Sequence, residues 1–293
     1  MKTKYSLLLI LFLASCAPLS KSQLKMSNNY YESIANYPRY YRELNVAVAD
    51  LDLEAKNLKS SLQTTDTERI ETIINSINEY EDAMRLPDSI QVHTRYIDQY
   101  VQDYYSLIPN GFSIYRTLKG TTETIGGIFG LGGVVSGILP SNPSSINPTK
   151  RRKIQEQVLT SGTELRKSLT ILRNYIDKSF IPRLEYIDRQ SIEDFERLLE
   201  SINNSTPPLE YYTRHNRMLT DFYQRLYRTK SLVKQLSKAI DSFMVVEKEL
   251  TDRFAEKANI DIEETHLNEL INDMQRINYL MHDLDDYKQK STL

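Results

Sequence analysis

The sequence has few of the residues that interrupt helices or crosslink a chain. Its 293 residues include 9 glycines, 10 prolines, one cysteine and no tryptophan. Six of the glycines fall between Gly126 and Gly137, so the rest of the chain is poorer still in glycine. A single cysteine excludes a disulfide within the chain. The scarcity of glycine and proline outside one segment favours long helices.

A large excess of either charge is also missing. The chain has 37 lysines and arginines against 39 acidic residues, with a formal net charge of -2. This balance argues against the basic surface of a nucleic-acid-binding protein, so we expect no nucleic-acid partner. The motifs of serine hydrolases, zinc proteases, P-loop proteins and Rossmann enzymes are absent as well. We therefore expect no enzyme, no catalytic residue and no cofactor.

A helical metal enzyme is the least supported interpretation of the chain. Glu263 and His266 have the spacing of one ligand pair in a di-iron helical bundle, but the chain has no second Glu-x-x-His. The aspartates around His282 indicate a solvated acidic face. We predict no metal site.

The N-terminus has the order of features found in an export signal. Lys2 and Lys4 precede an apolar run over residues 7–13, and Leu13-Ala14-Ser15-Cys16 places small residues directly before the only cysteine. This segment resembles the lipobox of bacterial lipoproteins. The resemblance implies cleavage of a signal peptide, residues 1–15, and attachment of lipid to Cys16. Two or three acyl chains would anchor the protein stably to a membrane.

Two other interpretations of the N-terminus stay open: a cleaved signal with a coincidental cysteine, and an uncleaved membrane helix. The apolar run is shorter than the ~20 residues that span a bilayer. Ala17, rather than aspartate, follows the cysteine, as in many outer-membrane lipoproteins of Gram-negative bacteria, and this resemblance implies the outer membrane of the cell envelope rather than the inner membrane. The polar residues 16–29 predict a flexible tether between lipid and fold.

The remainder of the chain predicts an all-α fold. Apolar residues recur at alternating spacings of three and four over residues 30–62, 219–254 and 267–284, the heptad pattern of helices with one apolar seam. Ile70, Ile73, Ile77, Tyr80 and Met84 continue this pattern, and Pro87 predicts a kink. We expect an elongated antiparallel helical bundle, or coiled-coil rod, made of an N-terminal helical pair (30–108) and C-terminal long helices (150–293).

A glycine-rich apolar insert and a proline-rich connector, residues 109–149, separate the two halves. Residues 125–139 carry no charge, and as a helix they would extend ~22 Å, less than the ~30 Å of bilayer hydrocarbon. The residues that we expect to contact a membrane or a partner are Ile125, Gly126, Gly130, Leu131, Gly133, Val134, Gly137 and Ile138. Their basic flanks contain Lys119, Lys150, Arg151, Arg152 and Lys153. Basic flanks suit a loop that dips into an anionic leaflet, and a connector buried in the bundle is the alternative.

The layout of long helices around a mid-chain apolar tongue resembles α-helical pore-forming toxins of the cytolysin A and tripartite haemolysin type. That resemblance implies a pore-forming or membrane-inserting protein that uses residues 120–139. Our leading hypothesis is instead a non-enzymatic, lipid-anchored envelope lipoprotein that acts as a helical scaffold or docking protein. Its expected partners are the membrane, through the lipid on Cys16, and a protein or a second copy, through the helices or the insert.

Overall fold

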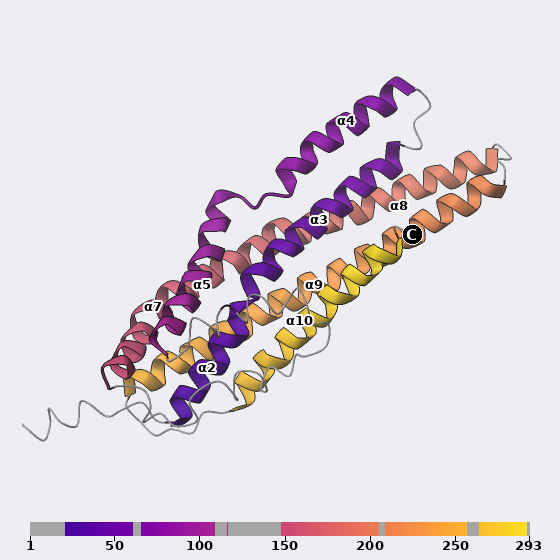
Figure 1. Ribbon diagram of the computed structural model, residues 1–293. Coiled ribbons are helices and arrows are strands. Elements are labelled where there is room, and N and C mark those ends of the chain that lie inside the picture. The colour runs from indigo at the N-terminus through magenta and orange to yellow at the C-terminus, as the bar shows by residue number, and fades with distance from the viewer. Residues whose placement is uncertain are drawn as a thin grey trace, which may run out of the picture. The chain divides into compact units, whose positions relative to one another are not determined.

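The computed structural model describes residues 21–60, 66–108, 116, 148–204, 209–256 and 264–291. Every regular element in these ranges is a helix, which confirms the predicted all-α class (Figure 1). The elements in chain order are α2 (Lys21–Ala35), α3 (Tyr37–Ser60), α4 (Asp66–Ala83), α5 (Asp88–Leu107), α7 (Pro148–Tyr175), the π-helix η2 (Ile176–Phe180), α8 (Ile181–Asn204), α9 (Leu209–Glu256) and α10 (Glu264–Ser291).

The chain divides into two compact units. Unit 1 comprises residues 1–36, 96–169 and 241–272, and unit 2 comprises residues 37–95, 170–240 and 273–293. Because the units interleave along the sequence, they do not coincide with the predicted N-terminal and C-terminal halves. The elongation of the bundle stays a prediction.

Unit 2 is built around α3. Three tyrosines near its start donate hydrogen bonds to three other helices: Tyr37 to the Leu236 carbonyl (3.1 Å), Tyr40 to Asn278 Oδ1 (3.0 Å) and Tyr41 to the Leu172 carbonyl (3.0 Å). Further along α3, Asp52 pairs with Arg183 of α8 at 2.9 Å, and Glu54 pairs with Arg225 of α9 at 2.9 Å. Helix α3 thus contributes both tyrosine hydrogen bonds and ion pairs to the packing of unit 2.

Unit 1 contains α2, which is buried over most of its second half. Tyr30, Tyr31 and Ile34 are fully buried, and several polar residues of the same helix are also buried: Ser27, Asn28, Glu32 and Ser33. The Tyr31 ring stacks on Tyr104 with centroids 3.7 Å apart, and the Tyr30 ring packs edge-on against Phe243. Such aromatic pairs add stability beyond the area they bury.

Two boundaries differ from expectation, and a third position, before a proline, has an irregular helix. Helix α2 begins at Lys21, inside the segment predicted as a tether, because Met26, Ser27 and Asn28 are buried in unit 1. The kink expected at Pro87 is a break between α4 and α5. Before Pro182, the π-helix η2 forms, and the Ile181 N–H bonds to the Ile176 carbonyl; proline lacks the N–H that would continue regular α pairing.

Candidate functional site

Most residues of the predicted contact site lie outside the described part of the chain. These are Cys16, Lys119 and all eight contact residues between Ile125 and Ile138. The other basic-flank residues, Lys150 to Lys153, lie in the first turns of α7. Arg152 is exposed there and pairs with Glu156 one turn later at 2.9 Å, the usual arrangement of a solvated helix surface.

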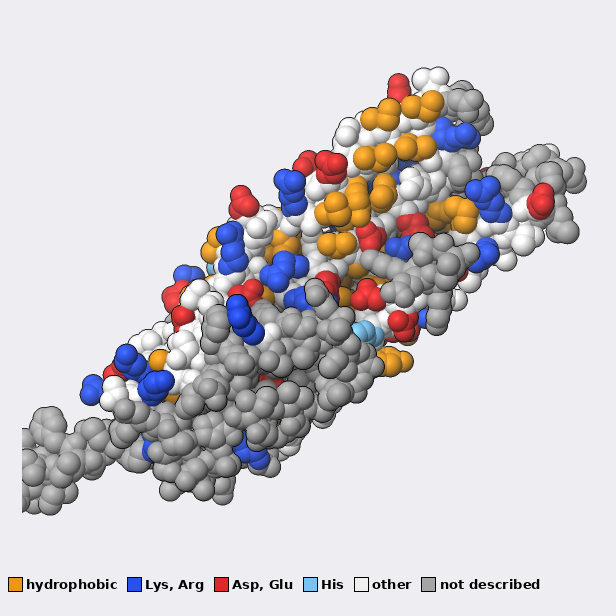
Figure 2. All heavy atoms as spheres, viewed as in Figure 1, with side chains coloured by type: hydrophobic (Ala, Val, Ile, Leu, Met, Phe, Trp, Pro, Cys, Tyr) orange, Lys and Arg blue, Asp and Glu red, His pale blue; other side chains and the backbone are white. Residues whose placement is uncertain are grey.

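The described residues carry a different candidate contact surface, on α4. Ile70, Ile73, Ile74 and Ile77 are spaced as one face of a helix, and their exposed fractions are 56%, 37%, 53% and 49%. We call these four residues the α4 isoleucine face. Figure 2 shows hydrophobic side chains in a row along α4. The sequence pattern therefore identified an apolar face correctly, but the expectation that it belongs to the packed bundle seam is wrong.

The side of α4 that neighbours the isoleucines packs on α3, and this orientation explains why the isoleucines are exposed. Helix α4 packs on α3 through polar and small groups: Tyr80 donates a 2.7 Å hydrogen bond to Asp50, and Lys56 pairs with Glu79. The bond to Asp50 raises the pKa of Tyr80 to about 12, because it favours the protonated phenol. These contacts leave the isoleucine side without a helix of unit 2 over it among the described residues.

Asn45 of α3 fixes the C-terminal end of α4. Its side-chain amide donates to the carbonyls of Ala83 and Met84 at 3.0 and 2.9 Å. The last carbonyls of a helix have no partner within the helix, so this bond satisfies groups that would otherwise need water. Since Asn45 is itself buried, the end of α4 is held in one place on α3.

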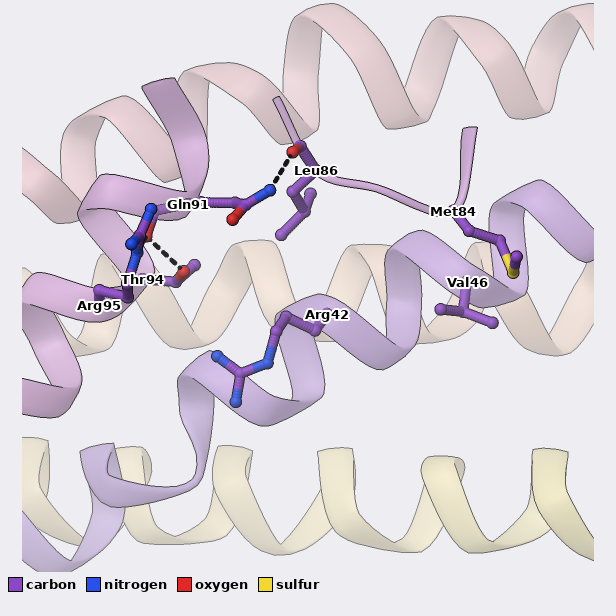
Figure 3. A pocket seen from close by; sticks show the side chains of 7 residues that line it. All are labelled: Arg42, Val46, Met84, Leu86, Gln91, Thr94 and Arg95. Carbon is purple, nitrogen blue, oxygen red and sulfur yellow. Dashed lines mark hydrogen bonds between the residues drawn. The ribbon is translucent and has the colours of Figure 1, made fainter. Parts of the chain in front are cut away.

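A pocket of about 480 Å³ lies beside this fixed end, between α3, the turn after α4 and the start of α5 (Figure 3). Its lining residues are Arg42, Val46, Met84, Leu86, Gln91, Thr94 and Arg95. Figure 3 shows the two arginines toward one side, and Val46 and Met84 toward the other. None of the described residues that line the pocket is acidic.

Hydrogen bonds hold the wall of this pocket. The Gln91 amide donates to the Leu86 carbonyl at 2.7 Å, and the Thr94 hydroxyl donates to the Gln91 carbonyl at 3.0 Å. The Arg95 Nε donates to the same Gln91 carbonyl at 3.4 Å. These hydrogen bonds tie the start of α5 to the turn before it and so fix one wall of the pocket.

Unit 1 contains a buried acidic group on α9. Glu247 interrupts the apolar seam of α9 and is 1% exposed. It accepts hydrogen bonds from Arg166 Nη1 at 2.5 Å and from Thr251 Oγ1 at 2.7 Å. Burial raises the pKa of Glu247, and its two partners oppose that rise because both stabilise the carboxylate.

Gly162 of α7 allows the close approach that this network needs. A Cβ at position 162 would overlap the Glu247 carboxylate and lie 2.8 Å from Thr251 Oγ1. A lone acidic residue in an apolar seam indicates that a partner is needed. The partner itself could not be predicted, because no spacing rule connects Glu247 to a helix more than eighty residues earlier. The group supports packing, and we assign it no chemistry.

The remaining histidine and membrane candidates give no site. His266 Nδ1 lies 2.5 Å from Glu249 Oε1, whereas its predicted companion Glu263 lies outside the described residues. The described residues contain no group of three potential metal ligands. No helix within the described ranges is both long enough and apolar enough to cross a membrane.

Comparison with known proteins found no matching family model, no matching curated protein and no matching solved structure. The helices of the structure define the class as an all-α protein. The case for function depends on the α4 isoleucine face, the adjacent pocket and the N-terminal sequence.

Proposed function

We propose that the protein is a non-enzymatic, lipid-anchored lipoprotein of the cell envelope that acts as a helical scaffold or docking protein. The N-terminal sequence supports the anchor, since Leu13-Ala14-Ser15-Cys16 follows a basic start and an apolar run. The lipid on Cys16 places the chain at the outer membrane. The helices then present contact surfaces near that membrane.

The α4 isoleucine face is the single observation that carries the docking role. Isolated exposed hydrophobic residues are common, but four isoleucines on one helical face form a continuous patch. Exposed patches of this kind mark interaction sites. The α4 isoleucine face suits a partner protein that packs an amphipathic helix of its own against it.

The charges around the face favour a protein over a bilayer as the partner. Glu71, Glu81 and Asp82 are exposed on the same helix. Helices that lie on anionic membranes carry lysine and arginine beside their apolar face, because the lipid headgroups are negative. Carboxylates next to the isoleucines would be repelled by such a surface.

Photo-crosslinking tests the docking role. A benzophenone amino acid replaces Ile73 or Ile74 in cells that express the full chain, and matched probes replace Tyr227 and Tyr279, which are exposed on α9 and α10. We expect discrete crosslinked products from the α4 positions and none from the matched positions. Equal crosslinking from all four positions, or none from α4, would contradict docking through α4.

Lipid attachment is tested separately by metabolic labelling with an alkyne fatty acid. We expect label on the natural chain and none on Cys16→Ser, with the natural chain in the outer-membrane fraction. Labelling of the Cys16→Ser chain, or an unlabelled natural chain, would remove the anchor from the proposal. The docking role would survive that result, since its evidence comes from α4.

The alternative function is an α-helical pore-forming or membrane-inserting protein that uses residues 120–139. The charge-free stretch 125–139 and its glycine spacing support it. Leakage of dye from anionic vesicles, compared between the natural insert and Gly130→Asp, discriminates the two functions. Leakage that Gly130→Asp abolishes would favour the pore, and absence of leakage from both chains would exclude it.

A further inference from the structure

The pocket beside the end of α4 has two chemically different sides. Arg42 and Arg95 bring guanidinium groups to it, and Val46, Met84 and Leu86 bring apolar carbon and sulfur. A volume of about 480 Å³ falls in the range of small-molecule sites. A ligand that matches both sides has an anionic head and a short apolar chain.

The arginines suit an oxyanion with several acceptor oxygens. A guanidinium carries five N–H donors in a planar fork, so one donor can be used within the protein while others bind a ligand. Arg95 illustrates this, since its Nε donates to the Gln91 carbonyl and its terminal nitrogens are separate donors. Bidentate bonds to phosphate or carboxylate are the strongest that arginine makes.

The apolar side is built into the fold rather than assembled from loose side chains. Leu86 is 5% exposed, and the Gln91 amide bonds to its carbonyl. Met84 is 37% exposed, and Asn45 binds its carbonyl. An alkyl chain against these residues would cover methionine and valine surface that water now contacts.

We propose that this pocket binds an amphiphilic anion, a phosphate or carboxylate headgroup on a short alkyl chain, with the headgroup at Arg42 and Arg95 and the chain against Val46, Met84 and Leu86. The inference concerns a ligand of unit 2 and does not depend on lipid anchoring or on docking through α4. A phospholipid headgroup region and a free acyl or alkyl phosphate share this chemistry.

Calorimetric titration of the full chain tests the proposal with three probes: hexyl phosphate, inorganic phosphate and hexanol. We expect saturable binding of hexyl phosphate at one site, at least about tenfold tighter than inorganic phosphate, and no saturable binding of hexanol. A short-chain phosphatidic acid with two six-carbon chains separates the sources. Binding tighter than that of hexyl phosphate indicates a lipid, and weaker binding indicates a free single-chain anion.

Charge variants locate the site. Arg42→Gln and Arg95→Gln should each weaken hexyl phosphate binding by about tenfold or more, and Arg189→Gln, an exposed arginine of α8 outside the pocket, should leave it unchanged. Circular dichroism of each variant verifies the fold. Equal binding by all three variants would overturn the proposal.

Methyl NMR tests the same site in the natural chain, so it does not require the arginine variants to fold. With labelled methionine methyl groups, hexyl phosphate should shift the Met84 resonance, assigned through Met84→Leu, and leave Met218 of α9 unshifted. Met218 is a matched control because it is also 37% exposed. Equal shifts at both methionines would show adsorption to exposed apolar surface and refute the pocket. Absence of saturable binding would also refute it.

Discussion

Helices α9 and α4 share an apolar pattern but differ in what covers it. Along α9, Phe222, Val233, Ile240 and Leu250 repeat at heptad-like spacing, and each is 2% exposed or less. Along α4, the four isoleucines repeat just as regularly and are 37–56% exposed. The same periodicity therefore describes a core seam in one helix and an open surface in the other.

The difference lies in how each helix is held by its neighbours. The buried face of α9 is mostly apolar, so hydrophobic burial is its main source of stability. Helix α4 is attached to α3 by hydrogen bonds and an ion pair: Tyr80 bonds to Asp50, Glu79 pairs with Lys56, and the Asn45 amide binds the end of α4. A helix fixed through polar contacts has its apolar side available for another molecule.

Truncation of a buried aromatic side chain in α9 should have the largest effect. Phe222 is fully buried, and Phe222→Ala should lower the free energy of unfolding by ~3–5 kcal/mol, because it removes a ring and leaves a cavity. Urea unfolding followed by the helical circular dichroism signal measures this. The control is Tyr227→Ala, one turn further on and 73% exposed, with an expected loss below ~0.5 kcal/mol. Similar losses for both would contradict the assignment of the α9 seam.

The buried carboxyl of Glu32 should make stability depend on pH. Burial raises its pKa from 4.5 to about 8. The folded state binds this proton more tightly than the unfolded state does. Protonated Glu32 therefore contributes fully to the free energy of unfolding below pH ~4.5, and this contribution is lost as pH rises through 8. Relative to the natural chain, Glu32→Gln should have similar stability at pH 5 and gain on the order of 3 kcal/mol at pH 9.

Urea midpoints at the two pH values measure the effect of Glu32→Gln. Glu71→Gln, which changes an exposed carboxyl of α4, is the matched control and should show no such gain at pH 9. An equal response of the two variants would mean that Glu32 is ionised at neutral pH in the folded chain.

The packing at Gly162 predicts an intermediate effect that depends on Glu247. Alanine is normally the better helix former by ~1 kcal/mol, yet Gly162→Ala should destabilise by ~1–2 kcal/mol, because its methyl group displaces a carboxylate fixed by Arg166 and Thr251. In a Glu247→Ala background, the same change should become neutral or stabilising. A double-mutant cycle from urea unfolding measures the coupling, and strict additivity would refute the contact.

Much of the fold was predictable because helix periodicity is a local property of sequence. The all-α class and the α9 and α10 seams followed from spacing alone, including the buried positions Leu267, Leu270, Ile277 and Met281. The hydrogen bonds of the buried tyrosines did not follow from spacing. Tyr41 bonds to a backbone carbonyl and Tyr104 bonds to Asn28, contacts that join residues far apart in the chain.

The α4 surface was not predictable, because its exposure depends on a competition between two faces. Ser76 is 4% exposed and the isoleucine face is open, which reverses the order that hydrophobicity predicts. The polar contacts that decide this orientation come from Asn45, Asp50 and Lys56 of another helix. The pocket depends on the same arrangement, since its residues come from three separate segments.

The smallest effect on stability is expected at the α4 isoleucine face. Ile74→Gln should change the free energy of unfolding by less than ~0.5 kcal/mol, because the side chain is already 53% exposed. The same substitution should reduce crosslinking from a probe at Ile73, since an amide in the centre of the face would be buried without a hydrogen bond when a partner docks. Urea unfolding and crosslinking yield are measured on the same chain, with Tyr279→Gln as the control. If Ile74→Gln instead destabilised the chain by ~2 kcal/mol or more, the α4 isoleucine face would be part of the folded core, and α4 would resemble α9.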